Sequence, residues 1–425
     1  MPKIKAFQGV RYNSSKVVLK DVVCPPYDVI NSKQKEEYKG NSPYNIVRII
    51  LPDSEKDSGI DYAKLDNSLN QWADKGIIVK DDEAALYIYS QQYEVDGTYY
   101  ERSGVLGLVE LKSEKEREVL PHEKVFQGPL LDRARLMQEL KSHLSPIFII
   151  FKDNKATATD LILDIVKSKK PDDEADMDGI NNRLWKVTDK NFIEQLTVLM
   201  KNAGVFIADG HHRFEASMKV NDYFTQKGLK DGGHKYTLAY FVSCDDPGLI
   251  ILPTYRAVKK LPEGFSFDYI IEKAGEYFDC DKIAVEDVDK VLLDAANAGK
   301  HIFVFYLDGR YMAITLKDND IIRKFSLKDK SECWNNLDVS ILHNMIFVEL
   351  LGIKEEIDEK KNVYYYKDRK ELLSDLKEGK FNLGVFFNAP SVADVEEVAD
   401  AGERMPQKST YFYPKPLTGM VMHRW

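Results

Sequence analysis

The segment Val205 to Glu215 (VFIADGHHRFE) holds the residues whose types and spacing are best suited to chemistry. An apolar stretch at 204–208 ends there, the chain passes Gly210, and a helical pattern follows over 214–224. The first turn of a helix exposes backbone N–H groups and carries a partial positive charge, so this turn suits an anion such as phosphate. Gly210 would let the backbone approach a ligand closely.

The polar side chains of this turn add more specific groups. Arg213 has the geometry to grip phosphate oxygens with two parallel hydrogen bonds. Asp209 is placed to hold a metal or to orient a histidine or a substrate hydroxyl, and His211 and His212 add donors. Alternatively, Asp209 only caps the helix and the histidines lie on the surface. We favour the functional interpretation, since packing explains five polar or flexible residues between apolar elements poorly. Zinc is disfavoured, because adjacent histidines point in different directions and no ligand follows at i+4.

A second candidate segment is Cys24 to Ile30 (CPPYDVI). Its two prolines fix an extended turn that would present Tyr27 and Asp28 rigidly. Asp28 is then a candidate catalytic carboxylate. The alternative is a structural corner in which Asp28 caps the next helix.

A third segment combines His122, Glu123 and Lys124 with Arg133 further along. Glu123 is a candidate acid or base, and Lys124 and Arg133 are candidate cations for a phosphorylated ligand. The alternative is a solvated loop, which is normally this highly charged.

The fourth segment, Met405 to Lys415, contains Lys408 and Ser409 in an order like that of a phosphate-binding loop. The upstream glycines of that motif are absent, so the motif itself is not present. Three aromatic residues follow at 411–413, and with the lysines around them they either line a nucleotide pocket or close the fold.

The elements around these segments predict an α/β to α+β protein with mixed sheets. Helices are expected at 59–74 and from Asp189, and hairpins at Asp96-Gly97 and Asp308-Gly309. The apolar run 45–51 reads as a buried strand. A linker-like stretch at 259–264 places a boundary near 260, which separates a first domain, 1–260, from an α+β C-terminal domain, 261–425.

Composition narrows the classes of protein. The chain has 425 residues with 44% hydrophobic and 30% charged residues, which indicates a globular protein. A net charge of −9 argues against nucleic acid or a membrane surface as an obligate partner. No apolar run is long enough to span a membrane, and the N-terminus lacks the apolar core of a signal peptide. With four dispersed cysteines and no CxxC pair, we expect a cytoplasmic protein with reduced thiols.

At these segments the chain is similar to the domain of unknown function 1015 family (DUF1015). The resemblance spans nearly the whole chain. It rests on short motifs, of which the Asp-Gly-His-His-Arg turn is the most specific: Pro25 to Ile30, Ser42 to Asn45, Pro121 to Lys124 with Asp132-Arg133, Ser145 to Phe148, Ala208 to Arg213, Leu252 to Thr254 and Met405 to Tyr413. The chain departs from the family where it has Tyr255 and Val125, in place of the frequent His and Thr, so a role for Tyr255 is doubtful.

That family resembles the ParB/sulfiredoxin-like fold, whose free-serine kinases carry a similar turn. The resemblance implies such a fold for 1–260, with an inserted β-hairpin region at about 84–150. It further implies a nucleotide-dependent phosphotransferase that uses ATP or ADP with Mg²⁺ and acts on a small hydroxyl metabolite, with serine as one candidate. Asp209, His211, His212 and Arg213 would then meet phosphate and substrate.

Other functions stay open at this stage. One is a non-catalytic nucleotide-binding regulator that uses the same turn. Another is a phosphatase acting on a phosphorylated metabolite such as phosphoserine, with His211 or His212 as acid or nucleophile. The apolar segment 339–350 is either a homodimer contact or a buried core helix.

Overall fold

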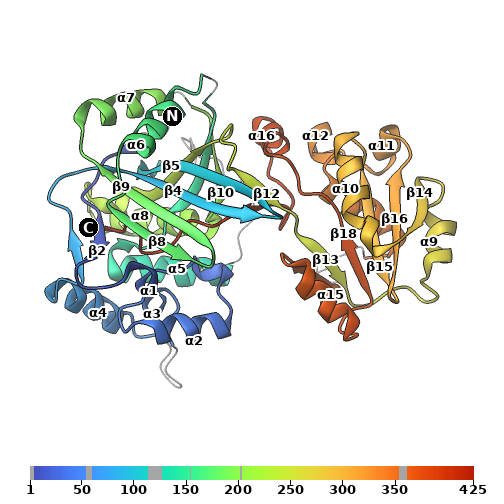
Figure 1. Cartoon of the computed structure of the whole chain (residues 1–425), viewed down its shortest axis with the longest axis horizontal. Coiled ribbons are helices and arrows are strands. Elements are labelled where there is room, and N and C mark those ends of the chain that lie inside the picture. Colours follow the sequence, from blue (N-terminus) through green and yellow to red (C-terminus); the bar gives the residue numbers. More distant parts are fainter. Residues whose placement is uncertain (1–3, 54–59, 113–126, 154, 202, 354–360) are drawn as a thin grey trace. The chain divides into compact units, whose positions relative to one another are not determined.

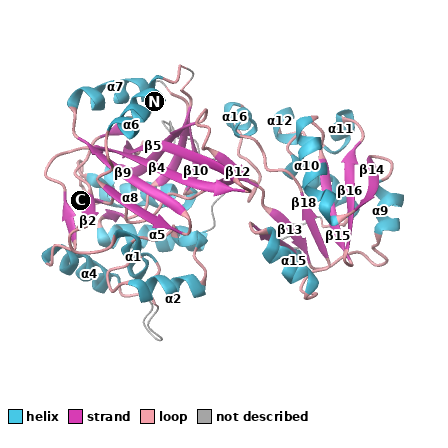
Figure 2. Ribbon diagram, in the orientation of Figure 1, coloured by secondary structure: helices cyan, strands magenta, loops and turns pink. Residues whose placement is uncertain are grey.

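The computed structural model of the chain describes residues 4–53, 60–112, 127–153, 155–201, 203–353 and 361–425 (Figures 1 and 2). The chain forms two compact units. The first contains Met1–Leu249 and, after a return of the chain, Pro414–Trp425, and the second contains Ile250–Tyr413. Each unit is described by itself below.

An eight-stranded sheet forms the centre of the first unit. Its strands, in sheet order, are β10 (Val205–Asp209), β7 (Ile147–Phe151), β11 (Tyr236–Ser243), β5 (Thr98–Glu110), β4 (Leu86–Val95), β9 (Ile180–Val187) and β8 (Asp173–Met177), with β1 (Ile4–Lys5) paired to β5. β7 and β11 run parallel and the other pairs antiparallel, so the sheet is mixed, as predicted. The region 84–150, expected as an insertion, supplies β4, β5 and β7 of this sheet.

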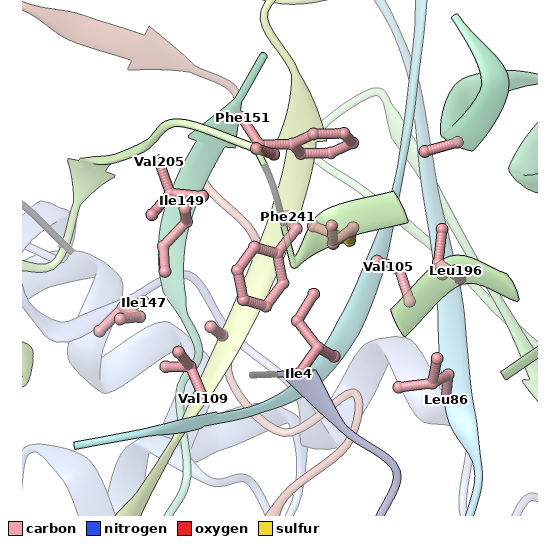
Figure 3. Packing of buried hydrophobic residues seen from close by; sticks show 14 of the residues in the cluster. Ile4, Leu86, Val105, Val109, Ile147, Ile149, Phe151, Leu196, Val205 and Phe241 are labelled. Atoms are coloured by element: carbon pink, nitrogen blue, oxygen red, sulfur yellow. The ribbon is translucent and has the colours of Figure 1, made fainter. Parts of the chain in front are cut away.

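The two faces of this sheet carry different side chains because successive residues of a strand point to opposite sides. One face is apolar, with Phe151 and Phe241 among its aliphatic side chains, and it packs against helices α6 (Thr157–Ser168) and α7 (Lys190–Met200) (Figure 3). Alternate positions place aromatic residues on the other face, and these are fully buried: Tyr87, Tyr89, Phe148 and Tyr240. The second face therefore needs a covering element that can satisfy tyrosine hydroxyls.

The remaining regular elements described in the first unit are helices of 3 to 16 residues and two small strand pairs. The helices are α1 (Leu19–Val22), η1 (Tyr27–Val29), α2 (Ser32–Asn41), α3 (Val47–Ile50), α4 (Tyr62–Asp74), α5 (Gln127–Leu140), α8 (His211–Gln226) and η3 (Gly233–Lys235). The strand pairs are β2 (Val10–Tyr12) with β3 (Ile78–Lys80), and β6 (Ser142–His143) with β20 (His423–Arg424).

The predicted strand at 45–51 is wrong: this run forms the helix α3. Asn45 is fully buried, and its side-chain oxygen accepts a hydrogen bond from the Val47 amide at 2.9 Å. Its amide group donates to the carbonyl of Asp21 at 2.8 Å. A short apolar run that is buried on all sides has no periodicity to separate a strand from a helix, so the tertiary environment of Asn45 decided the conformation.

The second unit is built on a six-stranded antiparallel sheet. Its strands, in sheet order, are β14 (Phe278–Ile283), β16 (Arg310–Leu316), β15 (Ile302–Leu307), β18 (Leu383–Phe386), β13 (Tyr255–Val258) and β17 (Val363–Tyr366). β12 (Ile250–Leu252) and β19 (Tyr411–Tyr413) form a separate pair. The helices are α9 (Phe267–Ala274), η4 (Val285–Asp287), α10 (Val288–Asn297), η5 (Asn319–Ile321), α11 (Ile322–Phe325), α12 (Glu332–Asn335), α13 (Asp338–Ile341), η6 (Leu342–Leu350), α15 (Arg369–Lys377) and α16 (Val392–Asp400).

The apolar segment 339–350 lies within α13 and η6. Seven of its apolar residues are buried in the second unit: Val339, Ile341, Leu342, Met345, Ile346, Phe347 and Leu350. Burial inside the chain removes the reason to expect a homodimer contact here.

Two buried histidines face each other where β6 and β20 pair. His143 and His423 are register partners, and their rings stack with centroids 5.8 Å apart. Burial lowers the pKa of His143 to about 4, against the opposing effect of a hydrogen bond to the Tyr236 carbonyl. Burial, together with the charges of His143, Lys80 and Lys5, lowers the pKa of His423 to about 3. Both rings are therefore neutral near pH 7 in the folded protein.

This pair predicts a loss of stability in mild acid. Unfolded histidines have a pKa near 6.5, so the unfolded chain binds more protons as the pH falls from 6.5 towards 4. Each buried histidine then removes up to about 1.4 kcal/mol of unfolding free energy per pH unit. We expect His423→Phe, which keeps a ring but cannot titrate, to show a shallower decline in urea unfolding between pH 7 and about pH 4.

The matched control for this experiment is Phe303→Leu, which changes a fully buried ring of the second unit and removes no titratable group. It should lower the stability but retain the wild-type pH dependence. Equal slopes for wild type and His423→Phe would contradict the assignment.

Candidate functional site

A sharp turn joins strand β10 to helix α8 in the first unit. β10 ends at Asp209, Gly210 adopts φ 91° and ψ 29°, and α8 begins at His211. A positive φ of this size favours glycine, and a Cβ at this position would lie 3.1 Å from the Arg213 guanidinium. No side chain caps α8 at Gly210. The first turn of the helix is thus shaped by backbone conformation rather than by a capping side chain.

Asp209 is a buried carboxylate held between two cations. One oxygen accepts a hydrogen bond from Arg213 Nη2 at 2.5 Å, and the other accepts one from Lys415 Nζ. Burial by itself would raise the pKa of Asp209, but attraction to Lys415, Arg213 and His211 outweighs it, and the net effect lowers the pKa well below its usual range. Such a carboxylate is a poor proton acceptor. Its geometry suits positioning Arg213 and Lys415 instead.

Lys415 reaches Asp209 because the returning chain, 414–418, covers the aromatic face of the main sheet. Arg102 is fully buried, stacks on the Phe148 ring at 4.6 Å and donates to the Pro414 carbonyl. The Gln91 amide donates to the Lys415 carbonyl at 3.2 Å. Because these hydrogen bonds go to backbone carbonyls, they fix the position of the segment. From that position the Nζ of Lys415 reaches Asp209.

A second arginine lies near the turn. Arg133 of α5 is buried, with its guanidinium 4.4 Å from the centroid of the Tyr27 ring. Its Nη1 donates to the Ile50 carbonyl at 2.7 Å, and its Nε donates to Asp132 at 2.9 Å. Burial and Asp28 raise the pKa of Tyr27 to about 12, against the opposing effects of Arg213 and Arg133. Tyr27 therefore stays protonated and can donate a hydrogen bond.

Arg133 and Arg213 line the same small cavity. Its volume is about 30 Å³, and Tyr27, Ser142 and Ser145 contribute to its wall. A cavity of this size holds about two water molecules, so it does not accommodate a nucleotide. An anion would instead contact the first turn of α8 and the half-buried His212. Arg133 and Arg213 would attract it electrostatically from the protein interior, where the low dielectric constant weakens screening. Among the described residues, the cations Arg133, Arg213 and Lys415 are buried, and they face the carboxylates of Asp209 and Asp132 and the exposed carboxylate of Asp28.

The residues predicted as a site are thus only partly brought together. Asp209, Gly210, His211, His212 and Arg213 form one turn.

Tyr27 joins Arg133 to this turn, and Asp28 lies exposed beside Tyr27. Glu123 and Lys124, with His122, lie outside the described residues. Lys408 and Ser409 belong to the second unit, where the Ser409 hydroxyl donates to the Pro406 carbonyl at 2.7 Å and the Lys408 carbonyl accepts from Arg256 at 3.1 Å.

The sequence analysis did not select Lys415 as a site residue. A signal was present, because Pro414 and Pro416 flank this lysine and restrict the backbone to an extended conformation. Nothing local, however, pairs it with Asp209.

The first unit is therefore a mixed α/β unit with a buried ion cluster at a helix N-terminus, an arrangement suited to anions. The chain belongs to the family described as "Protein of unknown function (DUF1015)", whose model matches residues 4–340. No curated protein matches the chain.

Solved structures with distant resemblance include three proteins. A conserved hypothetical protein from Pyrococcus furiosus has 16% identity and a TM-score of 0.33, over 70% of this chain and 88% of that one. A free serine kinase in complex with AMP has 15% sequence identity and a TM-score of 0.33, over 69% of this chain and 83% of that one. SbnI with C-terminal truncation from Staphylococcus aureus has 10% sequence identity and a TM-score of 0.34, over 74% of this chain and 85% of that one. At these TM-scores the resemblance supports no statement on what this chain binds.

Two further properties bear on the site. In the described ranges, no group of three or more His, Cys, Asp or Glu side chains is arranged to hold a metal ion. Among the described helices, none combines the length and apolar character that crossing a membrane requires.

The ion cluster makes Asp209 important for stability. Asp209→Asn removes the carboxylate charge that Arg213 and Lys415 share, and we expect the unfolding free energy to fall by about 3 kcal/mol. Asp28→Asn is the matched control, since the same change at an exposed aspartate should stay within about 0.5 kcal/mol of wild type. Urea unfolding of both variants measures the difference. Similar values for the two would show that the cluster does not stabilise the fold.

Proposed function

We propose that the first unit binds the phosphates of ATP or ADP at the N-terminus of α8 and transfers a phosphoryl group to the hydroxyl of a small metabolite. The observation that carries the proposal is the Asp209–Arg213–Lys415 cluster, which places two buried cations beside a helix start whose N-cap residue, Gly210, has no side chain. The resemblance of the Asp-Gly-His-His-Arg turn to that of free-serine kinases of the ParB/sulfiredoxin-like fold supports it and makes serine the first substrate to test.

Each part of the cluster has a separate role in this proposal. The first turn of α8 and His212 contact the phosphates, while Arg213 and Arg133 stabilise the charge that develops on the transferred group. Asp209 keeps Arg213 and Lys415 in position.

Magnesium fits this arrangement as part of the nucleotide complex. Mg²⁺ keeps several waters and needs only one or two carboxylates beside the phosphates, so a dedicated cluster of ligands is not required. The phosphates and waters would supply most of the ion's ligands, and Asp28 is kept for proton transfer because a carboxylate bound to Mg²⁺ is held ionised. The ion would neutralise phosphate charge.

The reaction itself needs a proton acceptor. The substrate oxygen forms a bond to phosphorus, the bond from phosphorus to the nucleotide oxygen breaks, and the hydroxyl proton passes to a carboxylate. Asp209 is unsuited to accept it because two cations hold it ionised. Asp28 is the candidate within the described residues, and Glu123 is the other candidate.

The non-catalytic regulator is the second candidate function. The observation in its favour is that both oxygens of Asp209, the described carboxylate at the start of α8, are engaged in ion pairs. Binding without turnover would then be the outcome.

These functions are separated by measuring binding and turnover in the same protein. We expect ³¹P NMR to show phosphoryl transfer from ATP or ADP with Mg²⁺ to serine or another small hydroxyl compound. Asp28→Asn should lower turnover by about 100-fold or more while nucleotide affinity, measured by calorimetry, changes little. His212→Ala should weaken nucleotide binding about tenfold.

The matched control is Asp329→Asn, an exposed aspartate of the second unit, which should behave as wild type. Nucleotide binding without any transfer would favour the regulator, and phosphate release from phosphoserine without nucleotide would favour a phosphatase. Absence of nucleotide binding would overturn the proposal.

A further inference from the structure

A much larger cavity lies elsewhere in the first unit. Its volume is about 630 Å³, within the range of small-molecule sites. Four stretches of chain supply most of its lining: 5–8, 80–84, 231–236 and 423–425. It shares no lining residue with the Tyr27 cavity. Helix α8 starts at the candidate site, and the 231–236 stretch follows its other end.

The charged side chains that line this cavity are mostly cations: Lys5, Lys80, Lys235 and Arg424, against the single carboxylate of Asp231. Asp231 is almost fully exposed and lies 3.6 Å from Lys235, so it compensates little charge. Arg424 donates to Asp66 at 2.6 Å.

Two of these cations have no such compensation. Within the described part of the chain, neither Lys5 nor Lys80 forms an ion pair, and the Lys5 ammonium lies 4.7 Å from the centroid of the Tyr236 ring. The cavity therefore carries an uncompensated positive charge that suits an anion.

A buried histidine belongs to the wall of this cavity. His423 lines the cavity but is only 7% exposed, and its Nδ1 has no hydrogen-bond partner among the described residues. Its ring stacks on Trp425 with centroids 5.3 Å apart. The Nδ1 nitrogen is itself buried, so His423 shapes the wall of the cavity through its ring and does not contact a ligand there.

We propose that this cavity binds a small organic phosphate, separate from the nucleotide at the α8 turn. Lys5 and Lys80 hold the phosphate group, because they are the lining cations that form no ion pair within the described residues. The volume exceeds what one phosphate fills, so the ligand carries an organic part, which lies against the apolar and aromatic wall formed by Phe7, Leu108 and Trp425.

Trp425 gives this proposal a local readout. In protein labelled with 5-fluorotryptophan, ¹⁹F NMR separates the four tryptophans, and Trp425→Phe identifies the signal of interest. The probe is inorganic pyrophosphate, which carries the charge of the phosphate group without an organic part. We expect a saturable shift of the Trp425 signal with half-saturation below about 1 mM.

Variants of the two unpaired lysines test the assignment. The double variant Lys5→Gln with Lys80→Gln should raise the dissociation constant at least about tenfold. Lys290→Gln with Lys300→Gln makes the same charge change at exposed positions of the second unit and should leave it unaltered. No saturable shift at Trp425, or equal affinity in the Lys5/Lys80 variant, would overturn the proposal. The outcome does not depend on turnover at the α8 turn.

Discussion

The buried carboxylate of Asp209 is the constraint on which the rest of the first unit depends. A charge in a low-dielectric interior is tolerated only when paired and hydrogen-bonded, and Asp209 has two partners, Arg213 and Lys415. One partner comes from the next helical turn and the other from the end of the chain. The fold must therefore bring 414–418 back across the sheet.

That return explains the unusual character of the sheet face beneath it. A face that carries Tyr89, Tyr240 and Arg102 cannot be covered by aliphatic side chains alone, since the polar atoms need partners. The returning backbone supplies them: its carbonyls accept from Arg102 and Gln91, and the Leu417 amide donates to the Tyr89 hydroxyl at 3.2 Å. The contacts that bury the aromatic face of the sheet therefore also orient Lys415 towards Asp209.

Helix α8 connects two regions of the first unit that contain cations. At its start, the Asp209 cluster and Arg133 place buried cations beside a small cavity. Beyond its end, the 231–236 stretch borders a large cavity in which Lys5 and Lys80 form no ion pair within the described residues. The two regions differ because the cations of the first are engaged around Asp209, whereas these two lysines are not engaged by a carboxylate.

Local features were predictable from the sequence by itself. The hairpins at Asp96-Gly97 and Asp308-Gly309 formed as predicted because both residues of each pair adopt positive φ, which this turn requires. Asp189 caps α7 through the Phe192 amide, three residues away. The strand, glycine and helix at 205–226 were likewise set by short-range preferences. Such preferences act over a few residues and leave a pattern in the chain.

Only the tertiary structure decided the partners of buried polar groups. Lys415 contacts Asp209 across 206 positions of the sequence, and Arg133 and Tyr27 are also far apart in the sequence. No local spacing pattern predicts either contact. The helix at 47–50 was missed for the same reason, because the groups that fix Asn45 come from another segment. A buried charge or amide accepts any partner that packing brings within reach, and packing is a property of the whole fold.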